Sequence, residues 1–304
     1  METFPVAGYC DPKFKKIESI FSEAIKSGHE LGASVAIEHE GEMVVNLFGG
    51  HKDEKREKAW EQNTWVNVFS VTKAVTATCI AKLIEEGKLS LYDPIEKFIP
   101  LAKKIRVAVP GEQMFEGNIV TEPLERPITV FDLLTFSSGA GYNDSVDKKG
   151  QSRLSNLWAE NDIYKGSGSL EDRVNKIMRL PFFEQPGKIW RYGWSTDILA
   201  RVIEVASEKS FGEFLNKKIF LPLEMNKTNF LSDENKDDQI AEVYTRNGAF
   251  NLTLVEGPRS NPLDWTPGSS GLVSNAEDYM KFALMLWNEG EYNGQKIVSP
   301  DSIA

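Results

Sequence analysis

Histidine and cysteine are scarce in this chain, and their scarcity excludes several chemistries. The 304 residues include only three histidines, His29, His39 and His51, and two cysteines, Cys10 and Cys79. No His-Glu-x-x-His pattern and no His/Cys cluster occurs, so we expect no zinc or other transition-metal site. Two cysteines do not make a disulfide framework, and we expect Cys79 to be a packing residue on a buried helix.

Phosphate-binding loops and the serine elbow of α/β-hydrolases are also missing. The sequence contains no Gly-x-x-x-x-Gly-Lys, no Gly-x-Gly-x-x-Gly and no Gly-x-Ser-x-Gly. We therefore expect no cofactor. A nucleophilic serine in this chain needs a base other than histidine, and lysine and tyrosine are the residue types left.

Long apolar runs and net positive charge are likewise absent. No stretch reaches the length of a membrane span, and no basic segment at the N-terminus leads into an apolar one, so we expect a cytoplasmic protein. The formal net charge of −10 argues against nucleic acid or a membrane surface as the partner. Contents of 41% hydrophobic and 26% charged residues are typical of a globular protein.

One segment stands out from this ordinary composition. Ser70 and Lys73 are followed by an apolar helical run over residues 74–84. A separation of one helical turn brings both side chains to the same face, and the unpaired N–H groups of a first helical turn favour developing negative charge. The pair therefore predicts a nucleophile and its proton partner. The alternative is an ordinary core helix whose serine caps the N-terminus.

The spacing alone is not specific. Ser145 and Lys148 have the same separation, but their neighbours are polar. Because no apolar helix surrounds that second pair, we interpret it as a solvated loop. Context, rather than spacing, distinguishes Ser70.

The N-terminal part of the chain predicts one helix and two strands. Apolar residues at helical spacing within 14–25 predict a helix that ends before Gly28. Residues 33–38 and 42–48 then predict two strands around a turn at 39–41.

Helix ends are predicted further along the chain. Gly87 is placed to cap the Ser70 helix. Capping boxes at 129–132, 210–213 and 274–277 predict three more helix starts. The last of these helices has a predicted inner face made of Tyr279, Phe282, Ala283 and Leu286.

The order of these elements favours an α+β fold with a small antiparallel sheet flanked by helices. We expect a single domain over residues 1–304, with a sheet-forming part at 1–65 and a mostly helical part at 66–290 that carries the active site. Two strands are too few for a sheet that stands alone.

Five ordered segments resemble the serine β-lactamase and penicillin-binding protein superfamily, most closely the class C-like branch that includes the family VIII carboxylesterases. The segments are 66–73, 133–139 (with Phe136 where histidine is usual), 185–192, 220–225 and 271–279. The resemblance spans nearly the whole chain. It implies a β-lactamase/transpeptidase-like fold.

The resemblance also implies roles for single residues. Ser70 would be the acylated nucleophile, Lys73 its proton partner, and Tyr192 the tyrosine whose phenolic oxygen faces the serine. Trp194 stands where many relatives have asparagine, which leans toward esters over β-lactams. Asp197 fits the esterase branch, where an aspartate opens the following helix as a favourable N-terminal charge.

Three aromatic residues near these motifs are predicted to line the substrate cleft: Trp194, Trp158 and Tyr142. The alternative for each is an ordinary core aromatic.

One motif of the superfamily is not found. A Lys-Thr-Gly, His-x-Gly or Trp-Gly-Gly segment normally follows well after the segment at 271–279, and the chain stops at Ala304. We therefore expect the C-terminal sheet strands to be missing, together with one of two oxyanion-hole donors. An incomplete sheet edge would favour self-association.

Taken with its resemblance, the sequence predicts a serine hydrolase that works through an acyl-enzyme on Ser70, a carboxylesterase on short-chain esters. The alternatives are a β-lactamase or D-Ala-D-Ala peptidase, an acyltransferase, or a catalytically inactive relative that binds a ligand. The expected partner is a small-molecule ester or amide.

Overall fold

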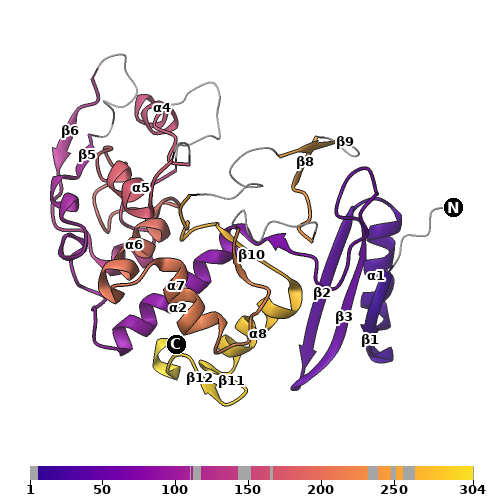
Figure 1. Ribbon diagram of the computed structural model, residues 1–304. Helices are drawn as coiled ribbons and strands as arrows, with labels where there is room; N and C mark the ends of the chain where they lie inside the picture. The colour runs from indigo at the N-terminus through magenta and orange to yellow at the C-terminus, as the bar shows by residue number, and fades with distance from the viewer. Residues whose placement is uncertain are drawn as a thin grey trace. The chain divides into compact units, whose positions relative to one another are not determined.

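The structure, a computed structural model, describes residues 6–109, 111, 118–142, 152–164, 167–231, 239–247, 251–255 and 264–303 (Figure 1). The prediction for Ser145 and Lys148 lies outside these residues. Contacts divide the chain into two compact units, Met1–Phe69 with Phe220–Leu263 and Gly271–Ala304, and Ser70–Ile219 with Asp264–Ser270. Later segments thus return to the N-terminal unit, a division that differs from the boundary expected at residue 65. The single-domain organisation stays a prediction.

The first unit is built on an antiparallel sheet in the order β1-β3-β2. β2 (Gly32–His39) and β3 (Glu42–Gly50) pair across Glu40 and Gly41, whose φ angles of 55° and 84° suit a two-residue hairpin turn. The predicted strand pair is confirmed. β1 (Val6–Cys10) pairs with β3 and was not predicted.

Helices pack against this sheet within the first unit. α1 (Lys15–Lys26), the helix predicted over 14–25, contacts β1 and β3. α8 (Ala276–Trp287) contacts β2. Because neighbouring residues of a strand point to opposite faces, the burial of both Val44 and Val45 shows that both faces of β3 are covered.

Short strands complete the first unit. β4 (Val66–Asn67) and β7 (Asn229–Phe230) both pair with β10 (Leu272–Ser274). Two further hairpins are formed by β8 (Tyr244–Asn247) with β9 (Asn251–Leu254) and by β11 (Glu291–Tyr292) with β12 (Gln295–Lys296).

The predicted start of α8 is wrong by one residue. The Asn275 side chain caps the helix by accepting a hydrogen bond from the Asp278 N–H at 2.9 Å. Ser274 instead lies in β10, and its hydroxyl bonds to Thr228 at 2.7 Å. The predicted inner face is also partly wrong, because Phe282 is buried but Ala283 is exposed.

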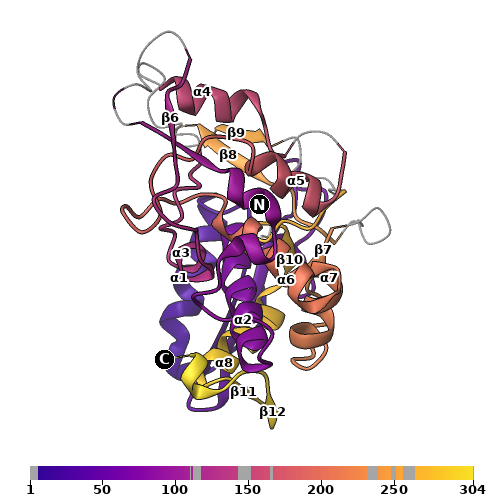
Figure 2. The same ribbon diagram turned by 90° about the vertical axis from the view of Figure 1, so that its left-hand side faces the viewer.

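The second unit packs its helices around α6 (Ser195–Ser207), in which nine of thirteen residues are buried. Figures 1 and 2 show α2 running beside α6. The helices that contact α6 are α2 (Thr72–Glu85), α3 (Val130–Leu134), α5 (Leu170–Ile177) and α7 (Phe211–Leu215). This unit also contains α4 (Arg153–Glu160) and the antiparallel pair β5 (Arg106–Ala108) and β6 (Thr121–Pro123).

Several predicted helix ends are confirmed in the second unit. Gly87 follows α2 with a φ of 66°, and the capping boxes at 129–132 and 210–213 are both present. Cys79 is fully buried in α2 as predicted, and its burial raises the pKa of its thiol above the ordinary value. Among the helices that the structure describes, none has the length and apolar character needed to cross a bilayer.

Candidate active site

Ser70 lies at the junction between a strand and a helix. β4 ends at Asn67, a 3₁₀ turn spans Phe69–Val71, and α2 begins at Thr72. Ser70 thus precedes the α-helix rather than lying in its first turn. The alternative that it caps α2 is not supported, since Val71 occupies the N-cap position and no side chain caps the helix.

The residue before Ser70 has an unusual backbone conformation. Phe69 has a φ of 44°, in the left-handed region that bulky L-residues rarely adopt. Such a conformation costs about 1–3 kcal/mol and persists only when its surroundings enforce it. The turn that it creates leaves Ser70 exposed, so a substrate can reach its hydroxyl.

The three residues predicted to be catalytic meet at the Ser70 hydroxyl. The Lys73 Nζ atom lies 3.2 Å from Ser70 Oγ, and the Tyr192 hydroxyl lies 2.7 Å from the same atom. The Lys73 amine also lies 4.7 Å from the centroid of the Tyr192 ring, within reach of a cation–π contact. The Ser70 hydroxyl is therefore in hydrogen-bond contact with two groups that can move a proton.

The surroundings of Tyr192 favour its phenolate. Burial alone would raise the pKa of Tyr192, but hydrogen bonds with Lys73 and Ser70 and the positive charge of Lys73 outweigh burial and lower it. A lowered pKa makes the phenolate more accessible, and a phenolate at hydrogen-bond distance from a serine can accept the serine proton. Among the described residues, no group of three or more His, Cys, Asp or Glu side chains is arranged to hold a metal ion.

The loop at 135–141 holds the backbone around Tyr192. The Arg191 N–H donates to the Phe136 carbonyl oxygen at 2.8 Å. On the other side, Gly193 comes so close to Ala140 that a Cβ at this position would lie 2.1 Å from the Ala140 carbonyl oxygen. Only glycine permits this approach, so the backbone on both sides of Tyr192 contacts the loop at 135–141.

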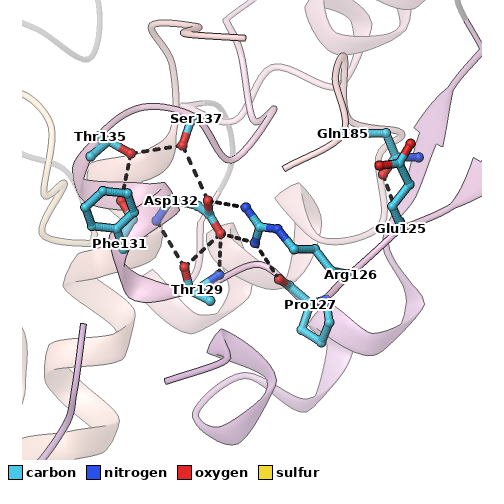
Figure 3. Close-up of polar contacts among 9 residues, drawn as sticks. All are labelled: Glu125, Arg126, Pro127, Thr129, Phe131, Asp132, Thr135, Ser137 and Gln185. Carbon is cyan, nitrogen blue, oxygen red and sulfur yellow. Dashed lines mark hydrogen bonds and ion pairs between the residues drawn. The ribbon is translucent and has the colours of Figure 1, made fainter. Parts of the chain in front are cut away.

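A buried carboxylate anchors the same loop (Figure 3). Asp132, 2% exposed, accepts hydrogen bonds from both terminal nitrogens of Arg126, each at 2.7 Å. It also accepts from the Thr129 N–H at 2.8 Å and from the Ser137 hydroxyl at 3.4 Å. Burial would raise the pKa of Asp132, but the hydrogen bonds from Arg126 and Thr129 and the Arg126 charge lower it. The ionised carboxylate thereby ties the loop to the start of α3.

The aromatic residues predicted to bind substrate fall into two groups. The Tyr142 ring lies 5.5 Å from Tyr192 and 4.8 Å from Trp194, centroid to centroid. Trp194 is 6% exposed, and its ring also lies 5.3 Å from that of Tyr164. Trp158 is 3% exposed, and its indole N–H donates to the Pro181 carbonyl oxygen at 2.9 Å. The structure brings Tyr142 and Trp194 to the site and places Trp158 in the core.

Two aromatic residues beside Tyr192 were not predicted to belong to the site. The Phe136 ring stacks on Tyr192 at 5.3 Å, and the Trp190 ring, 67% exposed, lies 6.2 Å from Tyr192. The replacement of the usual histidine by Phe136 was the available signal. Trp190 lies two residues before Tyr192, at the spacing that extended backbone places on one side.

Comparison with known proteins gives a match over most of the chain. The model of the Beta-lactamase family matches residues 17–302. Protein Rv1367c of Mycobacterium tuberculosis strain H37Rv is 26% identical over 86% of this chain, which spans 63% of that protein's length. Esterase EstB of Burkholderia gladioli is 23% identical over 88% of this chain and 68% of its own.

A solved structure shares the fold. EstCE1, described as a hydrolase with promiscuous acyltransferase activity, superposes with a TM-score of 0.78. The two proteins are 20% identical, and the superposition covers 95% of this chain and 75% of EstCE1.

Proposed function

Since this chain belongs to the Beta-lactamase family and has the β-lactamase/transpeptidase-like fold, we propose that it is a serine hydrolase that works through an acyl-enzyme on Ser70. One observation carries the proposal. Lys73 and Tyr192 both lie within hydrogen-bond distance of the Ser70 hydroxyl, and the pKa of Tyr192 is lowered.

The proposed reaction begins with proton transfer. Ser70 Oγ attacks the carbonyl carbon of an ester while its proton moves to the Tyr192 phenolate, and the Lys73 ammonium stabilises the phenolate beforehand. The tetrahedral intermediate then collapses, the carbon–oxygen bond to the alcohol breaks, and Tyr192 returns the proton to the departing alkoxide. Water repeats the sequence on the acyl-serine, which releases the acid and restores Ser70.

Esters are the proposed substrates, and short-chain carboxylic esters above all. Trp194 supports this choice because it stands in place of an asparagine, whose amide would offer both a donor and an acceptor to a substrate amide, while its own side chain is only 6% exposed. The similarity to an esterase of Burkholderia gladioli agrees with it. β-Lactams and D-Ala-D-Ala peptides carry the amide that such an asparagine would bind. Their hydrolysis rates are therefore the ones to compare with the rate for a short-chain ester.

Acyl transfer is a second candidate, favoured by the superposition on a hydrolase described as having promiscuous acyltransferase activity. An acyl-serine accepts either water or an alcohol, because both attack through an oxygen whose proton Tyr192 can take. Added alcohol would then divert product from acid to a new ester.

Intact-protein mass after incubation with a fluorophosphonate tests the proposal. Ser70→Ala is compared with Ser145→Ala, a control in which a serine of identical Ser-x-x-Lys spacing is removed. We expect one adduct on the natural chain and on Ser145→Ala, and none on Ser70→Ala. Labelling that persists in Ser70→Ala would overturn the assignment of Ser70. Hydrolysis rates of p-nitrophenyl butyrate, a β-lactam and a D-Ala-D-Ala peptide then distinguish the substrate classes.

A further inference from the structure

A fully buried carboxylate in the second unit has no part in the proposed chemistry. Asp197 lies in the first turn of α6 and is 0% exposed. Burial raises the pKa of Asp197 to about 6, against the lowering effect of hydrogen bonds from Ser269 and the positive charge of Lys73. A carboxylate near the positive end of a helix is already stabilised when it is exposed. Complete burial is costly, so it calls for a further role.

The contacts of Asp197 lead to the catalytic amine through one residue. The Ser269 N–H donates to Asp197 Oδ1 at 3.2 Å. The carbonyl oxygen of Ser269 accepts a hydrogen bond from Lys73 Nζ at 2.8 Å, shorter than the 3.2 Å contact of that amine with Ser70. Asp197 therefore binds the backbone N–H of Ser269, and the carbonyl oxygen of Ser269 binds the Lys73 amine.

The neighbouring residue fastens the same backbone to both helices. The Thr76 hydroxyl of α2, three residues after Lys73, donates to the Gly268 carbonyl oxygen at 2.7 Å. A Cβ at position 268 would lie 2.3 Å from the Thr196 carbonyl oxygen and 2.7 Å from the Ala200 Cβ. Only glycine lets the chain lie this close to α6. The Gly268–Ser269 segment is thus clamped between α2 and α6, with Asp197 as its charged contact.

We propose that Asp197 is a positioning residue, which fixes the Ser269 backbone so that the Ser269 carbonyl oxygen holds the Lys73 amine against Ser70. The inference rests on the proposed function in taking Ser70 as the nucleophile. The distance between Lys73 Nζ and Ser70 Oγ matters because a displacement of about 1 Å in a catalytic group can lower the rate a hundredfold.

The charge of Asp197 also acts on the proton acceptor. The titratable groups that interact with the Asp197 carboxylate are Lys73 of α2, Tyr142, which follows the loop at 135–141, and Tyr192, which lies just before α6. Its negative charge raises the pKa of Tyr192, opposing Lys73. Removal of this charge lowers the pKa of Tyr192, so the acidic limb of the acylation rate moves to lower pH.

Three variants separate this role from simple capping of α6. Asp197→Ala removes the hydrogen bond to Ser269 and the charge, whereas Asp197→Asn removes the charge and keeps an acceptor oxygen. Thr196→Val is the matched control, since Thr196 is the adjacent buried residue and its hydroxyl makes no hydrogen bond with any residue that the structure describes. The rate of fluorophosphonate labelling at Ser70 is measured against pH for each.

We expect labelling to fall about 10- to 100-fold in Asp197→Ala, to stay within a few-fold in Asp197→Asn, and to be unchanged in Thr196→Val. Of the two variants that keep most of the labelling rate, Asp197→Asn should show the acidic limb of its pH–rate profile at lower pH, and Thr196→Val should not. A capping role would affect both Asp197 variants through stability alone, and it would leave the labelling rate of folded Asp197→Ala unchanged. Equal labelling of Asp197→Ala and the natural chain would overturn the inference.

Hydrogen exchange gives a readout that does not depend on activity. Amide exchange in peptides that cover 264–270 should accelerate in Asp197→Ala and match the natural chain in Asp197→Asn and Thr196→Val. Unchanged exchange in Asp197→Ala would refute the inference whether or not Ser70 is labelled. An unlabelled natural chain with accelerated exchange in Asp197→Ala would refute the proposed function and leave the clamp supported.

Discussion

Replacement of Tyr192 by phenylalanine isolates the proposed base from its aromatic surroundings. The change removes only the hydroxyl 2.7 Å from Ser70 Oγ. The ring contacts with Phe136 at 5.3 Å and with Tyr142 at 5.5 Å are kept. The variant therefore tests proton transfer with little disturbance of packing.

The expected effect on rate is large, and the expected effect on stability is small. Loss of a positioned general base costs about 10²- to 10⁴-fold, so kcat/KM for p-nitrophenyl butyrate should fall by that factor. Loss of one hydrogen bond on a side chain that is 38% exposed should change the free energy of unfolding by no more than about 1 kcal/mol. Urea denaturation checks this second number.

The pH dependence of the hydrolysis rate gives a second test of Tyr192 as the base. A phenolate accepts a proton only above the pKa of Tyr192, which lies below its ordinary value of about 10. The rate of the natural enzyme should thus decline as the pH falls through that pKa, and Tyr192→Phe should lose this acidic limb. Tyr92→Phe, at an exposed tyrosine, serves as the control. A Tyr192→Phe rate within tenfold of the natural chain, with the limb unchanged, would refute Tyr192 as the base and favour Lys73.

Three further predictions concern the supports of the site. Asp132→Asn breaks the two hydrogen bonds with Arg126 and should lower the free energy of unfolding by about 2–3 kcal/mol, measured by urea denaturation at neutral pH. Because the pKa of Asp132 is lowered in the folded state, this stability is present above the pKa of the unfolded chain and is lost as the pH falls through the pKa of the folded chain. Equal stability of both chains at neutral pH would contradict the reasoning. Gly268→Ala places a Cβ 2.3 Å from the backbone of α6, so we expect the Lys73 contact to shift and labelling of Ser70 to slow by more than about tenfold; an unchanged labelling rate would count against the clamp. Cys79 is fully buried, and burial raises the pKa of its thiol, so it should react with a thiol reagent only after unfolding; reaction in native buffer would show that α2 opens.

Local signals predicted much of the fold because they act over a few residues. The β2–β3 hairpin follows from a turn at Glu40 and Gly41 between two apolar runs. The capping box at Thr129 and Asp132 follows from side chains that bond the backbone three residues away. The resemblance to the superfamily supplied the fold class, which the structural superposition and the family match confirm.

Elements that depend on distant partners were missed or misplaced. β1 was not predicted because Gly8 interrupts its pattern, and pairing with β3 holds it in the sheet. The predicted cap at Ser274 is wrong because the sequence does not reveal the pairing of Ser274 in β10 or its bond to Thr228. In both cases tertiary contacts outweigh local preference.

The site shows the same division. The contact between Ser70 and Lys73 is predicted from their spacing of one helical turn, and the role of Tyr192 is predicted from the resemblance. The hydrogen bonds that link Asp197, Ser269 and Lys73 join residues far apart in the chain, and no local pattern indicates them. Trp158 and Trp194 were given one expected role from their place near motifs, yet they pack in different surroundings.

The acyl-enzyme itself is the most direct test. The natural chain is mixed with p-nitrophenyl butyrate, quenched in acid within milliseconds, and examined by intact mass and peptide mapping. The account predicts an adduct of one butyryl group per chain on the peptide that contains Ser70, with no adduct in Ser70→Ala. Ester turnover with the butyryl group on another residue, or turnover that survives Ser70→Ala, would contradict it.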